Sequence, residues 1–370
     1  MSTPDKRALL ARIRPDVRAM HAYVVQHAQG MVKLDAMENP YSLPPELQTA
    51  LGQQLAALAL NRYPGARIET LRQTLIAQTP VPAGYDLVLG NGSDELISLL
   101  ALACATPASP DTGQRRACVL APEPGFVMYA MSAHLQGLDY VGVPLQADFE
   151  LDLVAMRAAI AQHRPALVYL AYPNNPSANL WRQDDVQAVI DAAEQAGSLV
   201  VIDEAYQPFA AHSWLARLGP QRHVLLLRTL SKFGLAGARI GYLIGAQALI
   251  AEIDKVRPPY NVSVLNAEAA LFALAHRSVF DQQAQLIRSE RERLLSALAA
   301  LPGVQVFPSQ ANMILLRVPN AQQTFDGMKL RGVLVKNVSK MHVLLTNCLR
   351  LTVGTADENR QMLTALEASL

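Results

Sequence analysis

The chain has 370 residues, which is more than one small hydrophobic core usually accommodates and predicts two domains. Its 32 Lys and Arg residues against 31 Asp and Glu residues give a net charge of +1. This balance excludes the long-range positive field that gathers nucleic acid or anionic membrane surfaces, so any anion site must be local.

Cysteine usage and the N-terminal sequence indicate a cytoplasmic protein. Cys104, Cys118 and Cys348 are odd in number and widely spaced, and they form neither a disulfide framework nor a CxxC metal motif. The N-terminal segment MSTPDKRALLARIRPD carries charges and proline where a signal peptide needs an apolar core. No stretch approaches the roughly 20 apolar residues of a membrane span. We expect no metal, membrane or nucleic-acid partner.

The predicted elements begin with helices over 7–28 and 44–60, which flank a loop containing Asn-Pro and Pro-Pro pairs. From about residue 66, short apolar strands alternate with helices. We expect strands at Asp86–Leu89, Ala117–Ala121, Ala166–Ala171, Ser198–Ile202, His223–Leu227 and Ile240–Ile244. Helices are expected between them at Asp94–Ala105, Leu151–Gln162 and Gln183–Gln195. This alternation is typical of an α/β fold with a largely parallel sheet covered on both faces.

The last hundred or so residues have a different pattern. Residues 263–300 predict long helix, and the charged run RSERERLLSALAAL within it is typical of a solvated helix face. The remainder predicts a small α+β unit that ends in a helix from Asp357. We therefore expect a large cofactor domain over 46–262 and a smaller α+β domain built from both chain ends, 1–45 and 263–370.

Ligands in α/β sheets collect at the carboxyl ends of the strands, and four predicted strand ends here carry polar clusters. The first, in LVLGNGSDEL, passes through two glycines into a helix that begins near Ser93. Glycine permits close backbone approach, and free N–H groups at a helix start bind phosphate. Ser93 and Asp94 also fit an ordinary helix cap with acids in its first turn.

The second strand end places Asp203 directly after a buried strand in VVIDEAY. A buried acid must be paired, and a protonated pyridine nitrogen would pair it while keeping the ring an electron sink. A magnesium ion or a structural ion pair would also satisfy it. Tyr206 could bond a ring hydroxyl, although a buried tyrosine commonly finds some other partner.

The third strand end, in LRTLSKFGLAGARIGY, delivers Thr229, Ser231 and Lys232 into a Gly-rich turn, and Arg239 follows seven residues after the lysine. An ammonium group is disfavoured near a guanidinium, so this setting favours an imine-forming amine. The hydroxyls and Arg239 could share a phosphate. The alternative is an ordinary surface lysine in a loop.

The fourth strand end leads into the rigid turn YPNNP, where Asn175 could donate its amide to a ring oxygen in the same crevice. Asn-Pro pairs are also an ordinary turn signal, so this cluster alone is weak.

Taken in order, GNGSDE, YPNNP, VIDEAY, SKFGLAGARIGY and CLRLTVG resemble the signature blocks of pyridoxal-phosphate (PLP) aminotransferases of the aspartate aminotransferase fold, fold type I. The blocks span 35–355 and follow the family order. KLDAMENPYSLP, LNRYPGA and NCLRLTVGT make the class II branch of histidinol-phosphate aminotransferases the most similar. The resemblance implies a mostly parallel seven-stranded sheet between helices in the large domain.

The resemblance also implies a role for each matching residue. Lys232 would hold PLP as a Schiff base and move the proton at the substrate Cα. Asp203 would face the pyridine nitrogen, with Tyr206 and Asn175 at the ring oxygen. Phe126 would stack on the ring. The phosphate would be bound by Ser93, Asp94, Thr229, Ser231 and Arg239.

Further matches imply a homodimer with shared active sites. Tyr63 matches a residue that the family sends across the dimer interface to the neighbouring phosphate. Arg350 matches the arginine that binds the substrate carboxylate, and Tyr23 and Lys336 match further substrate positions. Many relatives have arginine in place of Lys336, so this lysine would contact phosphate as a point charge.

The implied activity is transamination between L-histidinol phosphate and 2-oxoglutarate, giving imidazole acetol phosphate and L-glutamate in histidine biosynthesis. Arg350 would then bind phosphate in one half-reaction and a carboxylate in the other, which its fork geometry permits. The rivals on this fold are an aromatic or broad-range amino-acid aminotransferase and a phosphothreonine-type decarboxylase. A PLP-sensing regulator would need a DNA-binding module, and the roughly 30 residues before LDAMENP are too few for one.

Overall fold

The computed structural model describes residues 9–22, 26–109, 111 and 113–370, and the chain divides after Gly30 into two parts that are described separately. The described residues of the first part form η1 (Leu10–Arg12) and α2 (Pro15–Ala19). The predicted single helix over 7–28 is therefore wrong for these residues. Pro15 cannot continue a preceding helix because it lacks an N–H group, whereas its fixed φ suits the first position of a new one.

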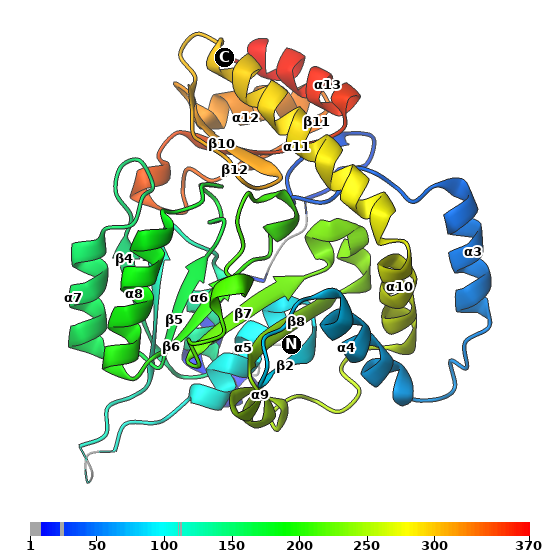
Figure 1. Ribbon diagram of the computed structural model, residues 1–370. Helices are drawn as coiled ribbons and strands as arrows, with labels where there is room; N and C mark the ends of the chain where they lie inside the picture. Colours follow the sequence, from blue (N-terminus) through cyan, green and yellow to red (C-terminus); the bar gives the residue numbers. More distant parts are fainter. Residues whose placement is uncertain (1–8, 23–25, 110, 112) are drawn as a thin grey trace. The chain divides into compact units, whose positions relative to one another are not determined.

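The second part contains a seven-stranded sheet in the order β2-β8-β7-β6-β5-β3-β4 (Figure 1). The strands are β2 (Tyr85–Asn91), β3 (Cys118–Glu123), β4 (Asp139–Pro144), β5 (Leu167–Ala171), β6 (Leu199–Asp203), β7 (Val224–Thr229) and β8 (Ile240–Ala246). Only β8 is antiparallel to its neighbours, so the mostly parallel seven-stranded sheet is confirmed. The six predicted strands lie within two residues of their expected bounds. The seventh, β4, had no predicted range because most of its residues are only half-buried or exposed.

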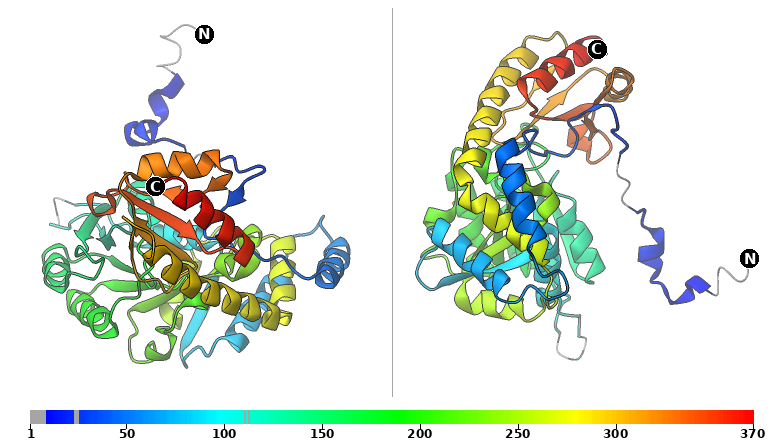
Figure 2. Two further views of the ribbon diagram at one scale, coloured as in Figure 1. Left: turned by 90° about the horizontal axis from the view of Figure 1, so that it is seen from above. Right: turned by 90° about the vertical axis from the view of Figure 1, so that its right-hand side faces the viewer.

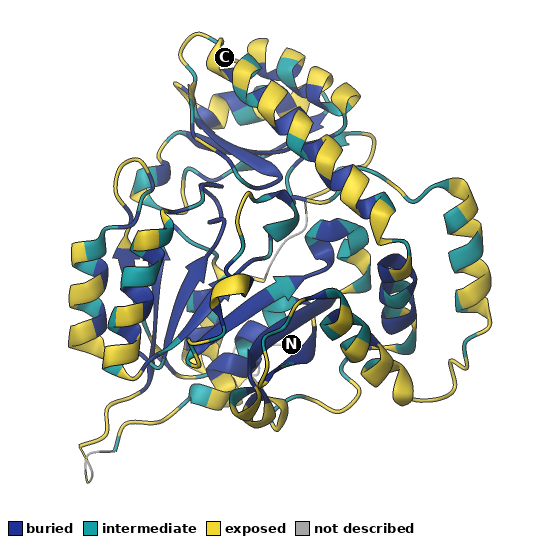
Figure 3. Ribbon diagram, viewed as in Figure 1, coloured by how far each residue is buried: buried dark blue, intermediate teal, exposed yellow. Residues whose placement is uncertain are grey.

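Helices cover both faces of this sheet, as the alternation predicts. One face carries α5 (Ser93–Cys104), α6 (Met128–Leu135) and α9 (Gln247–Asp254). The other carries α4 (Ala66–Gln78), α7 (Leu153–His163), α8 (Gln183–Ala196) and α10 (Val264–Ala275). Apart from the edge strand β4, the strands between them are almost wholly buried (Figure 3).

Strand β6 shows how the two faces are specified. Its side chains alternate between the faces, so Val200 and Ile202 pack on the α8 side while Val201 packs on the α5 and α6 side. Continued by two residues, the same alternation sends Asp203 and Glu204 to opposite faces.

The C-terminal region is built around a four-stranded antiparallel sheet in the order β12-β13-β10-β9. Its strands are β9 (Gln305–Val306), β10 (Met313–Arg317), β12 (Lys336–Asn337) and β13 (Cys348–Thr352). Its helices are α11 (Arg277–Ala299), α12 (Ala321–Leu330) and α13 (Ala356–Glu367), and α13 packs beside the other two (Figure 2). The helix predicted over 263–300 is divided at His276, which leaves helical geometry between α10 and α11.

Residues near the start of the second part join this C-terminal region. Strand β1 (Val32–Lys33) pairs in parallel with β11 (Val333–Leu334). Helix α3 (Pro45–Ala56), which follows, carries no buried residue (Figure 3). The domain boundaries expected at 46 and 262 stay predictions.

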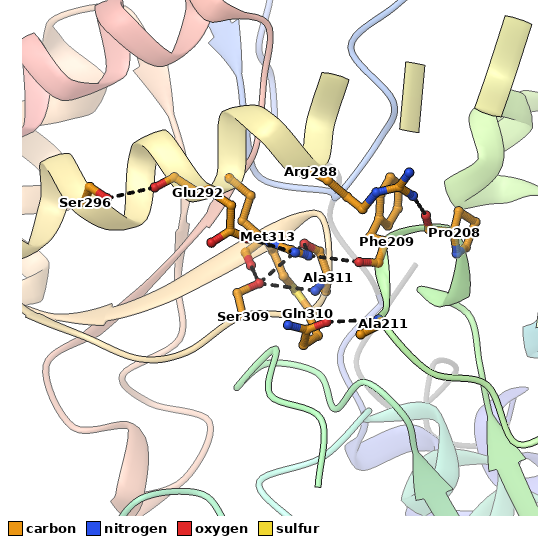
Figure 4. Close-up of polar contacts among 11 residues, drawn as sticks. Pro208, Phe209, Ala211, Arg288, Glu292, Ser296, Ser309, Gln310, Ala311 and Met313 are labelled. Atoms are coloured by element: carbon orange, nitrogen blue, oxygen red, sulfur yellow. Dashed lines mark hydrogen bonds and ion pairs between the residues drawn. The ribbon is translucent and has the colours of Figure 1, made fainter. Parts of the chain in front are cut away.

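Helix α11 also contacts the segment that follows β6. Arg288 donates a hydrogen bond to the carbonyl of Pro208 at 2.6 Å (Figure 4). The buried Arg291 donates to the carbonyl of Phe209 at 3.0 Å. Both acceptors lie in the short helix η2 (Gln207–Phe209). Helix α11 therefore fixes the backbone immediately after the predicted site residue Tyr206.

Candidate active site

The site lies where the parallel strands of the large sheet end. Since β8 is antiparallel to both β2 and β7, these two strands run in the same direction, and their carboxyl ends meet at one edge with those of β5 and β6. The four polar clusters singled out in the sequence follow these four strands. The topology thus brings them to one edge of the sheet.

In the turn after β2, the backbone at Gly92 lies directly against the side chain of Arg239. Gly92 has φ 81°, and a Cβ at this position would lie 2.6 Å from Nη2 of Arg239. The same nitrogen donates to Oδ2 of Asp94 at 3.2 Å. Ser93 is the first residue of α5 and Gly92 occupies the N-cap position, so Ser93 does not cap the helix, but the acids expected in its first turn are there, at Asp94 and Glu95. Free N–H groups beside a guanidinium suit a phosphate.

Two hydroxyl groups lie at the end of β7. Oγ of Ser231 and Oγ1 of Thr229 are 3.0 Å apart, and the backbone N–H of Ser231 donates to Oγ1 of Thr229 at 3.1 Å. Oγ1 of Thr229 is also 3.0 Å from the carbonyl of Ile240, the first residue of β8. Both side chains are buried. Arg239, one residue before Ile240, therefore lies near the hydroxyl pair, and because Ile240 pairs with the last residue of β2 it also lies near the turn at Gly92.

Lys232 follows directly in η4 (Ser231–Leu235). Its Nζ donates to the carbonyl of Ala36 at 3.2 Å and lies 5.9 Å from the centre of the Tyr206 ring. Loss of water around the ammonium group, with the positive charge of Arg350 as the second cause, lowers the pKa of Lys232 to about 8. A lysine in this state more readily supplies the neutral amine that nucleophilic chemistry requires.

A chain of hydrogen bonds joins three predicted residues. Nδ2 of Asn175 donates to the hydroxyl of Tyr206 at 3.0 Å, and Nη1 of Arg350 donates to Oδ1 of Asn175 at 2.8 Å. Nη2 of Arg350 donates to the carbonyl of Asp35 at 2.8 Å. Burial raises the pKa of Tyr206, so its hydroxyl stays protonated at neutral pH. The network holds the guanidinium of Arg350 beside the strand edge.

Asp203 is buried and accepts two hydrogen bonds. Its Oδ2 accepts from the hydroxyl of Tyr129 at 2.8 Å and its Oδ1 accepts from the backbone N–H of Ala205 at 3.0 Å. Burial is the main cause that raises the pKa of Asp203 to about 6. Among the described residues, no ion pair involves Asp203, and no group of three or more His, Cys, Asp or Glu side chains is arranged for a metal ion.

Sequence reasoning missed Tyr129. The residue lies three positions after Phe126 in APEPGFVMY, but this spacing gave no sign that its hydroxyl would reach a residue 74 positions away. Phe126 is half-buried and packs edge-on against Tyr129, with ring centres 5.6 Å apart.

The other predicted residues lie in different settings. Tyr63 is 76% exposed and stacks on Tyr260 with ring centres 4.3 Å apart. Lys336 is directly opposite Arg350 in the antiparallel pair of β12 and β13, so the two side chains share one face of that sheet. Tyr23 lies outside the described residues.

Residues 29–366 match the family model for aminotransferase class I and II. The chain is 65% identical over 373 residues to a histidinol-phosphate aminotransferase of Paracidovorax citrulli (strain AAC00-1) and 64% identical over 376 residues to one of Acidovorax sp. (strain JS42), with 100% of each chain covered in both comparisons. Among solved structures, histidinol-phosphate aminotransferase from Sinorhizobium meliloti in complex with pyridoxal-5'-phosphate is similar, with 26% identity and a TM-score of 0.82. That match covers 96% of this chain and 97% of the other.

No described helix is long and apolar enough to cross a membrane. The family match and the high identity both extend over nearly the whole chain. The strand edge carries the predicted cofactor residues apart from Tyr63. The chain belongs to the class I and II aminotransferase family.

Proposed function

We propose that this chain catalyses PLP-dependent transamination between L-histidinol phosphate and 2-oxoglutarate, giving imidazole acetol phosphate and L-glutamate in histidine biosynthesis. The observation that carries the choice of substrate is the 61–65% identity to four histidinol-phosphate aminotransferases over the full length of this chain. The geometry of the strand edge supports the same chemistry.

The residues at this edge fit PLP. A Cβ at Gly92 would lie 2.6 Å from Nη2 of Arg239, so glycine at this position lets the guanidinium lie directly beside the start of α5, and together they suit a phosphate. The buried carboxylate of Asp203 fits a protonated pyridine nitrogen, and the amine of Lys232 fits covalent attachment. When bound, PLP withdraws electrons from the substrate Cα. The ring oxygen, ring face and phosphate would be held by Asn175, Tyr206, Phe126, Ser93, Asp94, Thr229, Ser231 and Arg239.

Lys232 acts as the base in this proposal. Its Nζ would remove the proton from the Cα of the bound substrate, which PLP would make more acidic. The lowered pKa of about 8 places a useful fraction of the amine in the neutral form near physiological pH. Asp203 would keep the ring nitrogen protonated, and the pair formed by Asn175 and Tyr206 would orient the ring.

Arg350 and Lys336 would bind the acidic ends of the substrates. Their shared face places two cations side by side, which suits the doubly charged phosphate of histidinol phosphate. In the second half-reaction the fork of Arg350 receives a carboxylate of 2-oxoglutarate. Its bond to Asn175 ties this substrate contact to the cofactor contact.

The proposed active unit is a homodimer in the cytoplasm in which Tyr63 reaches the cofactor phosphate of the partner. The side chains of Leu60 and Tyr260 near Tyr63 are apolar and exposed, which supports burial of this surface against a partner subunit. A complementation experiment tests it. Mixing Lys232→Ala and Tyr63→Ala subunits should restore activity, because one site of each mixed dimer then has both residues intact. No gain on mixing would contradict the shared site.

Steady-state kinetics test the substrate. With 2-oxoglutarate as acceptor, kcat/KM for L-histidinol phosphate should exceed that for L-phenylalanine by at least about 100-fold, because the phenylalanine side chain offers no phosphate to the cations. Comparable values for the two donors would favour the broad-range aminotransferase. Release of carbon dioxide from phosphothreonine would favour the decarboxylase.

A further inference from the structure

We propose that Tyr129 is a positioning residue that orients the Asp203 carboxylate toward the ring nitrogen of the cofactor and keeps this carboxylate charged. The inference rests on the proposed contact between Asp203 and the ring nitrogen. Tyr129 itself does not need to touch cofactor or substrate.

The hydrogen bonds of Asp203 fix its orientation. One carboxylate oxygen, Oδ2, accepts from the hydroxyl of Tyr129 at 2.8 Å, and the other, Oδ1, accepts from the N–H of Ala205 at 3.0 Å. A donor on each oxygen prevents rotation of the carboxylate about its Cβ–Cγ bond. Each oxygen keeps lone-pair capacity for a further donor, such as the N–H of a protonated pyridine.

The hydroxyl of Tyr129 is held in place by its ring. Tyr129 is 2% exposed and stacks on Tyr169 with ring centres 4.3 Å apart and an interplanar angle of 12°. The three residues that meet here come from rigid elements: Tyr129 from α6, Tyr169 from β5 and Asp203 from the end of β6. A functional group supported in this way keeps its geometry better than one on a loop.

The electrostatics give Tyr129 a second effect. Burial favours the neutral form of Asp203, and the hydrogen bond from Tyr129 is the largest opposing cause. Burial and the negative charge of Asp203 raise the pKa of Tyr129 itself well above its usual range, so it remains a donor. Without this donor, Asp203 would hold its own proton to higher pH, and the ring nitrogen would lose its anionic partner.

A pair of matched variants tests the proposal. Tyr129→Phe keeps the stacked ring and removes one hydroxyl. Tyr169→Phe removes the hydroxyl of the ring stacked on it, which is buried and has no hydrogen-bond partner among the described residues. Both holoenzymes would be loaded with PLP labelled with ¹⁵N in the ring, and ring-nitrogen protonation would be followed by NMR beside the pH profile of kcat.

In Tyr129→Phe, loss of ring-nitrogen protonation should begin at lower pH, because Asp203 loses one of its two donors. The apparent dissociation constant for PLP should rise about tenfold, which is about 1.4 kcal/mol. Tyr169→Phe should match the parent protein in both measurements. A Tyr129→Phe protein with unchanged ring protonation and an unchanged pH profile would overturn the inference.

Asp203→Asn separates this inference from the proposed function. If Asp203→Asn abolishes ring-nitrogen protonation while Tyr129→Phe leaves it unchanged, the role of Asp203 stands and that of Tyr129 falls. If Asp203→Asn also leaves it unchanged, the contact between Asp203 and the ring nitrogen is wrong, and the inference falls with it.

Discussion

Asp203 and Glu204 are adjacent in the sequence and equally inaccessible, with 5% and 1% of their surface exposed, yet their surroundings differ in kind. Glu204 lies on one side of the sheet, where Arg228 donates to it at 2.8 Å and where Ser213 and the backbone of Trp214 add hydrogen bonds. Asp203 lies on the other side, with the hydroxyl of Tyr129 and one backbone N–H as its donors.

The difference teaches how one strand end serves two purposes. The charge of Glu204 is compensated within the protein, so this acid holds the turn after β6 together. Asp203 accepts two hydrogen bonds, but none of the described cationic side chains forms an ion pair with it, so this acid suits a cationic ligand. The period-two alternation of β6 separates the two roles across the sheet.

The largest effect is expected when the lysine that would hold the cofactor is removed. Lys232→Ala should lower transamination at least about 1,000-fold, because it removes both the attachment point and the base. The visible absorption of the purified protein should disappear as well. The control is Lys255→Ala, which removes an exposed lysine paired with Glu252 and should leave activity unchanged. Retained turnover and absorption in Lys232→Ala would overturn the lysine assignment.

The two acids themselves should respond in opposite ways. Asp203→Asn should lower kcat about 100-fold without lowering stability, because it removes charge aimed at the cofactor. Glu204→Gln should lower the unfolding free energy by about 3 kcal/mol, because it leaves the buried cation of Arg228 unpaired. Rate measurements and denaturant unfolding of both variants check this. Equal changes in rate and stability for the two would remove the distinction.

Arg350, a predicted substrate residue, and Arg228, the partner of Glu204, should differ in the same way as the two acids. Arg350→Ala should lower kcat/KM about 30-fold in both half-reactions, since the same guanidinium receives phosphate and carboxylate. Arg228→Ala should instead act mainly on stability because its partner is the structural acid Glu204. Each half-reaction is measured separately by single-turnover absorbance. If Arg350→Ala slows only one half-reaction, the two substrates do not both bind to this guanidinium.

The smallest expected effect is on the pH dependence of stability in the cofactor-free protein. The folded pKa of Asp203, about 6, is above its unfolded value, so the folded state binds the extra proton. Stability should therefore fall as pH rises from about 4 to 6. Asp203→Asn should remove this fall and stabilise the cofactor-free protein at pH 7 by about 2 kcal/mol. Thermal unfolding at pH 4 and pH 7 measures it, and an Asp203→Asn protein less stable than its parent at pH 7 would contradict it.

Local patterns were enough to predict most of the large sheet. Strands β5 to β8 are apolar on both faces, which the sequence displays directly, whereas the half-buried β4 has no such run. The errors in the helices at Pro15 and His276 came from breaks within otherwise helical composition. A proline signals such a break, but a histidine gives no comparable signal.

In the site, too, the sequence predicted what depends on local pattern and missed what depends on contacts between separate elements. The position of Asp203 at a strand end is local information, and its chemistry could be inferred from it. The partners that distinguish it from Glu204 are not local, because Tyr129 comes from α6 and Arg228 from the neighbouring strand β7. Side-chain contacts between separate elements depend on packing that no single segment encodes.

We propose above all that PLP binds covalently to Lys232, with Asp203 facing its ring nitrogen. The protein loaded with PLP can be reduced with borohydride, digested and analysed by mass spectrometry. One phosphopyridoxyl group on the peptide that contains Lys232 is the predicted result. Modification of a different lysine, or of none, would contradict the account.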